Sequence, residues 1–176
     1  MKKLIILPVL FLLFACQTES EKKSDHTQMD RSVTLETPSG ESIRTILAIE
    51  PQEQERGLSG VRSENFSEDE AMMFFDLEDN ERHFWMPDTY FDLDLFYLDK
   101  DLKILEVVRQ LPHHIGRSNP HLIPRAPRVW ARHVLEMKAT SEISKKLKVG
   151  DSLVWKDSLT LKETEERIKK SLQKTK

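Results

Sequence analysis

Apolar and polar residues alternate along most of the middle of the chain, in short runs separated by turn residues. Alternation of this kind is typical of β-strands, because successive side chains point to opposite faces of a sheet. The runs are also rich in Val, Ile, Leu, Phe and Tyr, as strands usually are. We expect strands within residues 32–50 (two of them), 70–77, 82–86, 93–99, 102–110, 133–139 and 152–155.

Turn residues divide these runs and indicate where short helices interrupt them. In "TPSGE", Pro38 fits the first turn position and Gly40 the left-handed one, which predicts a hairpin within residues 32–50. Residues 51–60 begin with Pro51 and end in a glycine-rich stretch, the usual limits of a helix of two or three turns. A second short helix is expected at 140–148. The pattern predicts a mainly β fold with minor α content: an antiparallel β-sandwich or barrel-like domain with one or two short helices.

The first residues have the pattern of a secretory signal. Lys2 and Lys3 precede an apolar run from Leu4 to Ala15, which is too short to remain as a membrane-spanning helix. The run ends in "LFAC", which resembles the cleavage motif of a bacterial lipoprotein. We therefore expect residues 1–15 to be a lipoprotein signal peptide and Cys16, the single cysteine, to carry the lipid. An ordinary cleaved signal with a chance cysteine is the alternative.

The mature protein is expected to lie on a membrane, anchored through lipid at Cys16 without spanning it. Gln17 rather than Asp follows the cysteine, which by resemblance to enterobacterial sorting favours the outer over the inner membrane, on its periplasmic face. Residues 16–31 have almost no apolar content and read as a disordered tether. Loss of Lys2 and Lys3 takes the formal charge from −3 to −5, which argues against nucleic acid as a partner.

Residues 32–156 form the expected single β-rich domain, and residues 157–176 a charged C-terminal helix or tail. Within the domain, six segments together resemble the bacterial and archaeal family known as domain of unknown function 192. They are "ERGLSG", "AMMFFD", "FWMPDT", "LDLFYLD", "LEMKA" and "KVGD". The resemblance implies a compact β-rich fold and implies no established activity. This chain departs from the usual family pattern at Ser59, Ala71, Pro87, Asp88 and Thr140.

Aromatic and acidic residues concentrate in "ERHFWMPDTYFDLDLFYLD", residues 81–99. Trp85, Met86, Asp88 and Thr89 are the candidate ligand-binding residues, since loop residues on a rigid β scaffold often carry function. An aromatic surface beside carboxylates suits a sugar, so a glycan or cell-wall fragment is the leading ligand. The alternative is a structural turn that Asp88 or Thr89 stabilises, with Trp85 packed beneath it.

Asp94 poses a different problem, because period-two alternation places it beside Phe96 and Leu98 on an apolar strand face. A buried carboxylate requires a donor partner. Arg56 of "ERGL" is the expected partner in a structural ion pair, because guanidinium binds carboxylate bidentately. A catalytic role for Asp94 is the alternative.

Other chemistry has weaker support in the sequence. The spacing of four histidines fits no established metal-ligand pattern, so we expect neither metal nor cofactor and interpret them as solvated loop residues: His113, His114, His121 and His133. The sequence contains no nucleophile motif, so an enzyme is the less favoured interpretation. A small-ligand-binding protein of the cell envelope is the leading hypothesis. An envelope carbohydrate-active enzyme using Asp88 or Asp92, or an accessory factor with a protein partner, are the alternatives.

Overall fold

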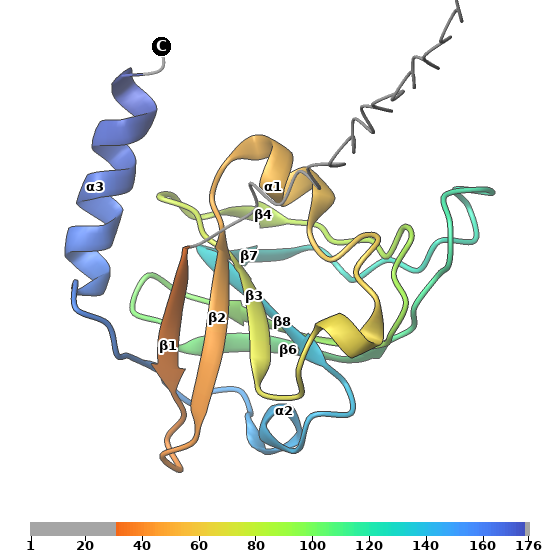
Figure 1. Cartoon of the computed structure of the whole chain (residues 1–176), viewed down its shortest axis with the longest axis horizontal. Coiled ribbons are helices and arrows are strands. Elements are labelled where there is room, and N and C mark those ends of the chain that lie inside the picture. Colours follow the sequence, from red (N-terminus) through yellow and green to blue (C-terminus); the bar gives the residue numbers. More distant parts are fainter. Residues whose placement is uncertain (1–30, 175–176) are drawn as a thin grey trace, which may run out of the picture.

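A seven-stranded sheet dominates the structure, a computed structural model that describes residues 31–174 (Figure 1). The strand order is β6-β5-β8-β3-β2-β1-β9, and β4 and β7 form a separate two-stranded sheet. The predicted signal peptide, Cys16 and the predicted tether up to residue 30 lie outside the described residues. The strands are β1 Ser32–Glu36, β2 Ser42–Ala48, β3 Glu70–Phe74, β4 Asn80–Arg82, β5 Leu93–Leu98, β6 Ile104–Leu111, β7 Val129–Ala131, β8 His133–Lys138 and β9 Val154–Trp155.

The large sheet curls until its two ends meet. Beyond the paired strands, Ile104 N–H donates to the Asp151 carbonyl at 2.8 Å, and Gly150 N–H donates to the Ile104 carbonyl at 2.9 Å. Leu153 N–H donates to the Leu102 carbonyl at 3.1 Å, so the segment that leads into β9 adjoins the start of β6. The prediction of a mainly β, barrel-like domain is confirmed.

One pair of strands differs from the antiparallel arrangement that we predicted. β2 and β3 run parallel, with Thr45 opposite Ala71, whereas the other pairs are antiparallel. A parallel pair requires a crossover connection. The crossover here consists of residues 49–69 and contains α1, Pro51–Arg56, and the 3₁₀ helix η1, Ser63–Asn65.

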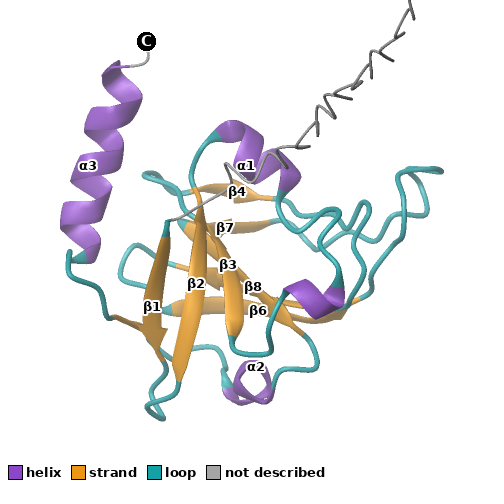
Figure 2. Cartoon of the chain, in the orientation of Figure 1, coloured by secondary structure: helices purple, strands orange, loops and turns teal. Residues whose placement is uncertain are grey.

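The helices are short, except for the last one, and lie outside the sheets (Figure 2). In α1, Glu53 accepts from the N–H of Glu50 at 2.9 Å within a capping box, and Pro51 begins the helix. Helix α2, Glu142–Lys146, is capped by Ser141. Helix α3, Leu161–Lys174, packs Leu161 and Ile168 against the apolar core. No helix within residues 31–174 has the length and apolar character needed to cross a membrane.

The curled sheet is buried on both faces, which gives two apolar cores. Phe96 and Leu98 of β5 belong to the first core, whereas Leu95 and Tyr97 belong to the second. Alternate residues of β5 therefore lie in alternate cores, so that both faces of the strand are buried. In β8 the same alternation places Val134 in the second core, so Glu136 points towards that face as well.

The short strands differ from the sequence prediction. Residues 82–86 were expected to form a strand, but β4 ends at Arg82 and beyond it Trp85 makes only an isolated bridge to Arg125. β7 follows a long loop with four prolines and was not predicted. Both strands have three residues, too few for a periodic pattern to be recognised.

Candidate functional site

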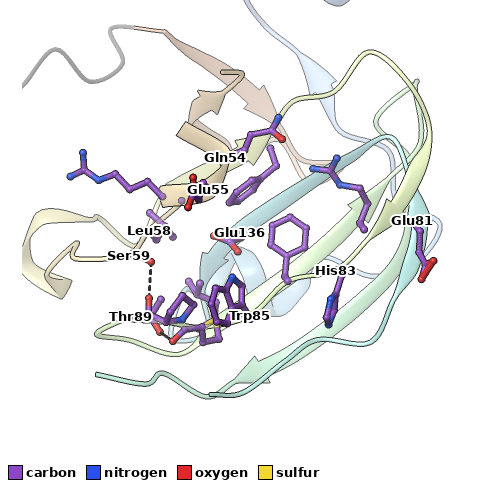
Figure 3. A pocket seen from close by; sticks show the side chains of 17 residues that line it. Gln54, Glu55, Leu58, Ser59, Glu81, His83, Trp85, Thr89 and Glu136 are labelled. Atoms are coloured by element: carbon purple, nitrogen blue, oxygen red, sulfur yellow. Dashed lines mark hydrogen bonds between the residues drawn. The ribbon is translucent and has the colours of Figure 1, made fainter. Parts of the chain in front are cut away.

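A pocket of about 240 Å³ opens on the face of the large sheet that packs against the second core (Figure 3). Its walls are residues 54–59, at the end of α1, and residues 81–87 together with Thr89. Phe74 of β3, Leu93 of β5 and Glu136 of β8 complete the lining. Three segments distant in sequence therefore meet here: the crossover after β2, the loop between β4 and β5, and the middle of β8.

Glu136 is the most unusual residue of this pocket. It is only 4% exposed, and its neighbours across the sheet are Met72 and Leu95. Its side chain points into the pocket between the labelled Leu58 and Trp85 (Figure 3). Within residues 31–174, no side chain or backbone group forms a hydrogen bond or ion pair with its carboxyl group. Buried carboxyl groups normally have such partners, so this one stands out.

Burial raises the pKa of the Glu136 carboxyl from 4.5 to about 8. The cause is desolvation, which disfavours the charged form. The carboxyl group therefore carries its proton at neutral pH. In that form it can both donate and accept a hydrogen bond.

Aromatic rings form much of the wall around this carboxyl. The ring of Phe84 meets Phe74 edge to face, with centroids 4.6 Å apart, and Tyr97 lies behind it at 6.4 Å. Trp85 is 43% exposed at the rim, where Arg125 lies 5.2 Å from the centroid of its ring. The pocket thus combines aromatic rings with several polar groups. The buried hydroxyls of Ser59 and Thr89 donate to loop carbonyls, whereas the Glu136 carboxyl has no such bond.

Gly57 allows the end of α1 to approach this wall closely. Its φ is +49°, in a region that other residues adopt at a cost, and a Cβ atom there would lie 2.9 Å from Cζ of Phe74. Glycine therefore satisfies both the backbone conformation and the space beside the ring.

The loop from Met86 to Thr89 is tied to the long loop between β6 and β7. Thr89 donates its hydroxyl proton to the Met86 carbonyl at 2.9 Å, and Thr89 N–H donates to the His114 carbonyl at 3.0 Å. Asp88 has φ +53°, and its carboxylate accepts from Gly116 N–H at 3.2 Å. These bonds match the structural turn of the alternative interpretation, but Trp85 is not packed beneath it as that interpretation expects, since it is 43% exposed.

The four candidate ligand-binding residues are thereby separated into two groups. Trp85, Met86 and Thr89 line the pocket, although Met86 and Thr89 are largely buried at 1% and 6% exposure. Asp88 does not line it and instead organises the loop. Asp92 is also outside the pocket: its Oδ1 lies 2.6 Å from Nδ1 of His113 in an exposed pair.

The predicted ion pair between Arg56 and Asp94 is wrong. Asp94 is 1% exposed and accepts hydrogen bonds from Arg109 at 2.6 Å, from the Ser144 hydroxyl at 2.6 Å and from Gln110 N–H at 2.8 Å. Asp94 shares the first-core face of β5 with Phe96, whereas Arg56 lines the pocket on the opposite face. The sheet therefore separates Asp94 from Arg56 and supplies Arg109 from the adjacent strand.

The interpretation of the histidines as solvated loop residues fails for His133. It begins β8, is fully buried and packs against Phe75, with ring centroids 4.6 Å apart. Its Nδ1 accepts from Asp76 N–H at 3.2 Å. Burial, together with the charges of Arg132 and Arg82, lowers the pKa of His133 to about 3, so it is neutral. The part of the chain that the structure describes contains no group of three or more His, Cys, Asp or Glu residues able to hold a metal.

Comparison with known families identifies the domain. Residues 33–155 match the family DUF192, described as "Uncharacterized ACR". The chain belongs to the DUF192 family. Five of the six segments that resemble this family contribute to the pocket: "ERGLSG", "AMMFFD", "FWMPDT", "LDLFYLD" and "LEMKA". Glu136 lies in the last of them, where an acid within an apolar strand was the signal in the sequence.

Two solved structures resemble this DUF192 protein. One is a Sinorhizobium meliloti 1021 protein whose description proposes a transcription regulator, with 26% identity and a TM-score of 0.55 over 70% of this chain and 92% of that chain. The other is a protein of unknown function from Novosphingobium aromaticivorans DSM 12444, with 23% identity and a TM-score of 0.56 over 70% of this chain and 84% of that chain. A comparison with curated proteins found no match.

Proposed function

We propose that this DUF192 protein is a lipid-anchored protein of the cell envelope that binds a small polar ligand in the Glu136 pocket. A glycan or cell-wall fragment is the ligand class that we favour. The observation that supports this proposal is the buried carboxyl group of Glu136, which faces an aromatic-walled pocket and has no partner within residues 31–174.

The carboxyl oxygens of Glu136 are reached from the pocket and have no hydrogen-bond partner within residues 31–174. A ligand in the pocket could therefore bind them directly. A sugar suits the arrangement, because its hydroxyl groups can donate to and accept from a protonated carboxyl while a ring face packs on Trp85. The volume of about 240 Å³ is slightly below the roughly 300–1,000 Å³ of most ligand sites and favours one or two sugar rings.

Binding is favoured over catalysis because of where the acids lie. Asp88 accepts from Gly116 N–H and Asp92 contacts His113, and neither residue lines the pocket. Glu136 is the acid that reaches the deep part of the pocket, and a single carboxyl does not provide the acid and base pair of a glycosidase.

The test is thermal unfolding of the detergent-extracted protein against a panel of glycans and peptidoglycan fragments. A ligand at about a hundred times its dissociation constant should add about 2.7 kcal/mol, a shift of roughly 5–10 °C. Trp85→Ala and Glu136→Gln should lose this shift. Trp130→Ala should retain it, because Trp130 is 67% exposed and outside the pocket. Loss of the shift in all three variants, or a panel without any shift, would contradict the proposal.

The proposed lipid anchor leads to a separate prediction about Cys16. Replacing Cys16 with serine should release the protein from the membrane fraction, because stable anchoring requires the acyl chains that the thiol would carry. The measurement combines membrane fractionation with metabolic labelling by a fatty acid. Unchanged membrane association of the Cys16→Ser protein, or label that persists in it, would refute a lipid anchor at this position.

A further inference from the structure

We infer that the ligand of this pocket presents a protonated amine to Glu136, so that the site selects amine-bearing molecules such as free amino sugars over their N-acetylated forms. This inference rests on the proposed binding function of the pocket and specifies the chemical group that the ligand brings to its deepest point.

The charges around the pocket support a cation at this position. Arg82 is already paired with Asp76 at 2.8 Å, and Glu81 with Arg128 at 3.1 Å. Glu55, Arg56 and His83 are exposed at the rim, where water screens them. Glu136 is thus the one acid of the lining that is both buried and unpaired in the described part of the chain. An entering cation would provide the opposite charge that this position lacks.

The surroundings of Glu136 suit an organic ammonium group. Hydrogen bonds between charged partners are roughly twice as strong as neutral ones, and the low dielectric of a buried site strengthens them further. Aromatic rings attract cations, and the rings of Phe74, Phe84 and Trp85 line this pocket. A glutamine at position 136 could also bind a neutral ligand, and its amide would avoid the desolvation that disfavours the charged form of an acid here.

A divalent metal suits the site less well. Calcium requires six to eight oxygen ligands and magnesium an octahedral shell, whereas Glu136 is the one buried acid of the lining and the other two, Glu55 and Glu81, are exposed. An ammonium group needs only one carboxylate and two or three further acceptors, which the ligand's own hydroxyl groups and water can supply.

Amine binding should be coupled to release of a proton. Because burial raises the pKa of Glu136 to about 8, its carboxyl group is protonated at neutral pH and must ionise to pair with an ammonium group. Affinity should therefore rise about tenfold per pH unit between pH 5.5 and 7. Tyr97, on the same face, has its pKa raised to about 12 by burial and remains protonated throughout. The remaining ionisable residues of the lining are Glu55, Arg56, Glu81, Arg82 and His83.

The test is isothermal titration of the detergent-extracted protein with matched probes: glucosamine and N-acetylglucosamine, each as monosaccharide and as β-1,4-linked disaccharide. Glucosamine probes should bind at least tenfold more tightly than N-acetylated ones at pH 7 and release a proton. Glu136→Gln should abolish this preference and the pH dependence, with its fold confirmed by thermal unfolding. Glu136→Asp should keep the preference at reduced affinity. His121→Asn, at an exposed position outside the pocket, should leave the affinity and its pH dependence unchanged.

The two possible failures are distinguishable. If the N-acetylated probes bind as tightly as the free amines, or more tightly, and binding still needs Glu136, then the amine inference is overturned while the binding function stands. If no probe binds at millimolar concentration, the inference is overturned for amino sugars, and a flat result in the wider glycan panel would then remove the proposed function as well. A preference for amines that survives in Glu136→Gln would also overturn the inference.

Discussion

Replacing Asp94 with asparagine should lower the free energy of unfolding by about 3 kcal/mol. Hydrogen bonds to a charged group contribute about 1.5–3 kcal/mol each, and asparagine keeps only part of the acceptor capacity of Asp94. The partner Arg109 is 38% exposed, so water compensates part of its charge. Asp94 is 1% exposed and binds Arg109, Ser144 and Gln110 N–H. Thermal unfolding should show a decrease in Tm of roughly 6–12 °C.

Asp92→Asn is the matched control, since Asp92 is two residues away and its exposed carboxylate contacts His113 alone, through the ring Nδ1 and the backbone N–H. Exposed ion pairs contribute about 0–1 kcal/mol, so Tm should change by no more than a few degrees. Equal destabilisation by the two substitutions would show that the burial of Asp94 is not the cause. An unchanged Tm in Asp94→Asn would show that the contacts with β6 and α2 contribute little to stability.

These contacts explain why Asp94 matters to the fold. Gln110 has φ +50° in β6, and the pairing of β5 with β6 is irregular between Leu93 and Leu95. Asp94 accepts from the N–H of Gln110 at this irregularity and from Ser144 of α2. Arg109 also donates to the Ser144 carbonyl at 2.9 Å. One buried carboxylate therefore joins a distorted strand pair to a helix that follows 50 residues later.

Much of the fold could be predicted because alternation and turn residues are local signals. The hairpin of β1 and β2 and the two-sided burial of β5 both follow from the order of residues in one short segment. The parallel pairing of β2 with β3 could not be predicted, because the crossover between them contains only short helices. The short strands β4 and β7 pair with each other across almost 50 residues, which no local pattern indicates.

The candidate site was less accessible to sequence reasoning, because it forms where three distant segments meet. Trp85 could be proposed from its neighbours alone, and it does line the pocket. Assigning Arg56 to Asp94 failed because alternation gives the face of a strand residue but not the side on which a helix end lies. Glu136 was missed although it interrupts an apolar strand, since the sequence does not show that neighbouring strands and loops leave it without a partner.

Glu136 should also give the protein an unusual dependence of stability on pH. Between pH 4.5 and about 8, the folded protein keeps a proton that the unfolded chain has lost, because the pKa is raised on folding. The free energy of unfolding must therefore fall as pH rises through this range. The pKa difference of about 3.5, from 4.5 to about 8, corresponds to about 5 kcal/mol in total.

His133 opposes this effect over part of the range. Its pKa is lowered from 6.5 to about 3, so between these values the unfolded chain binds a proton that the folded protein does not. Stability therefore rises with pH up to about 6.5 on account of His133. Between pH 4.5 and 6.5, Glu136 lowers the free energy of unfolding as pH rises, whereas His133 raises it. The loss caused by Glu136 should emerge alone between pH 6.5 and 8, where it amounts to about 2 kcal/mol.

Comparing the Glu136→Gln variant with the wild type isolates the contribution of Glu136 to the pH dependence of stability. Both proteins contain His133, and only the wild type has the titrating carboxyl group. The difference in stability between variant and wild type should grow from near zero at pH 4.5 to about 5 kcal/mol in favour of the variant at pH 8. Urea unfolding at intervals of half a pH unit measures this difference, with exposed Glu106→Gln as the control. A difference that stays constant with pH would mean that Glu136 is ionised in the folded protein. A ligand that pairs with the carboxylate should reduce the difference at pH 8, which connects stability to binding at this pocket.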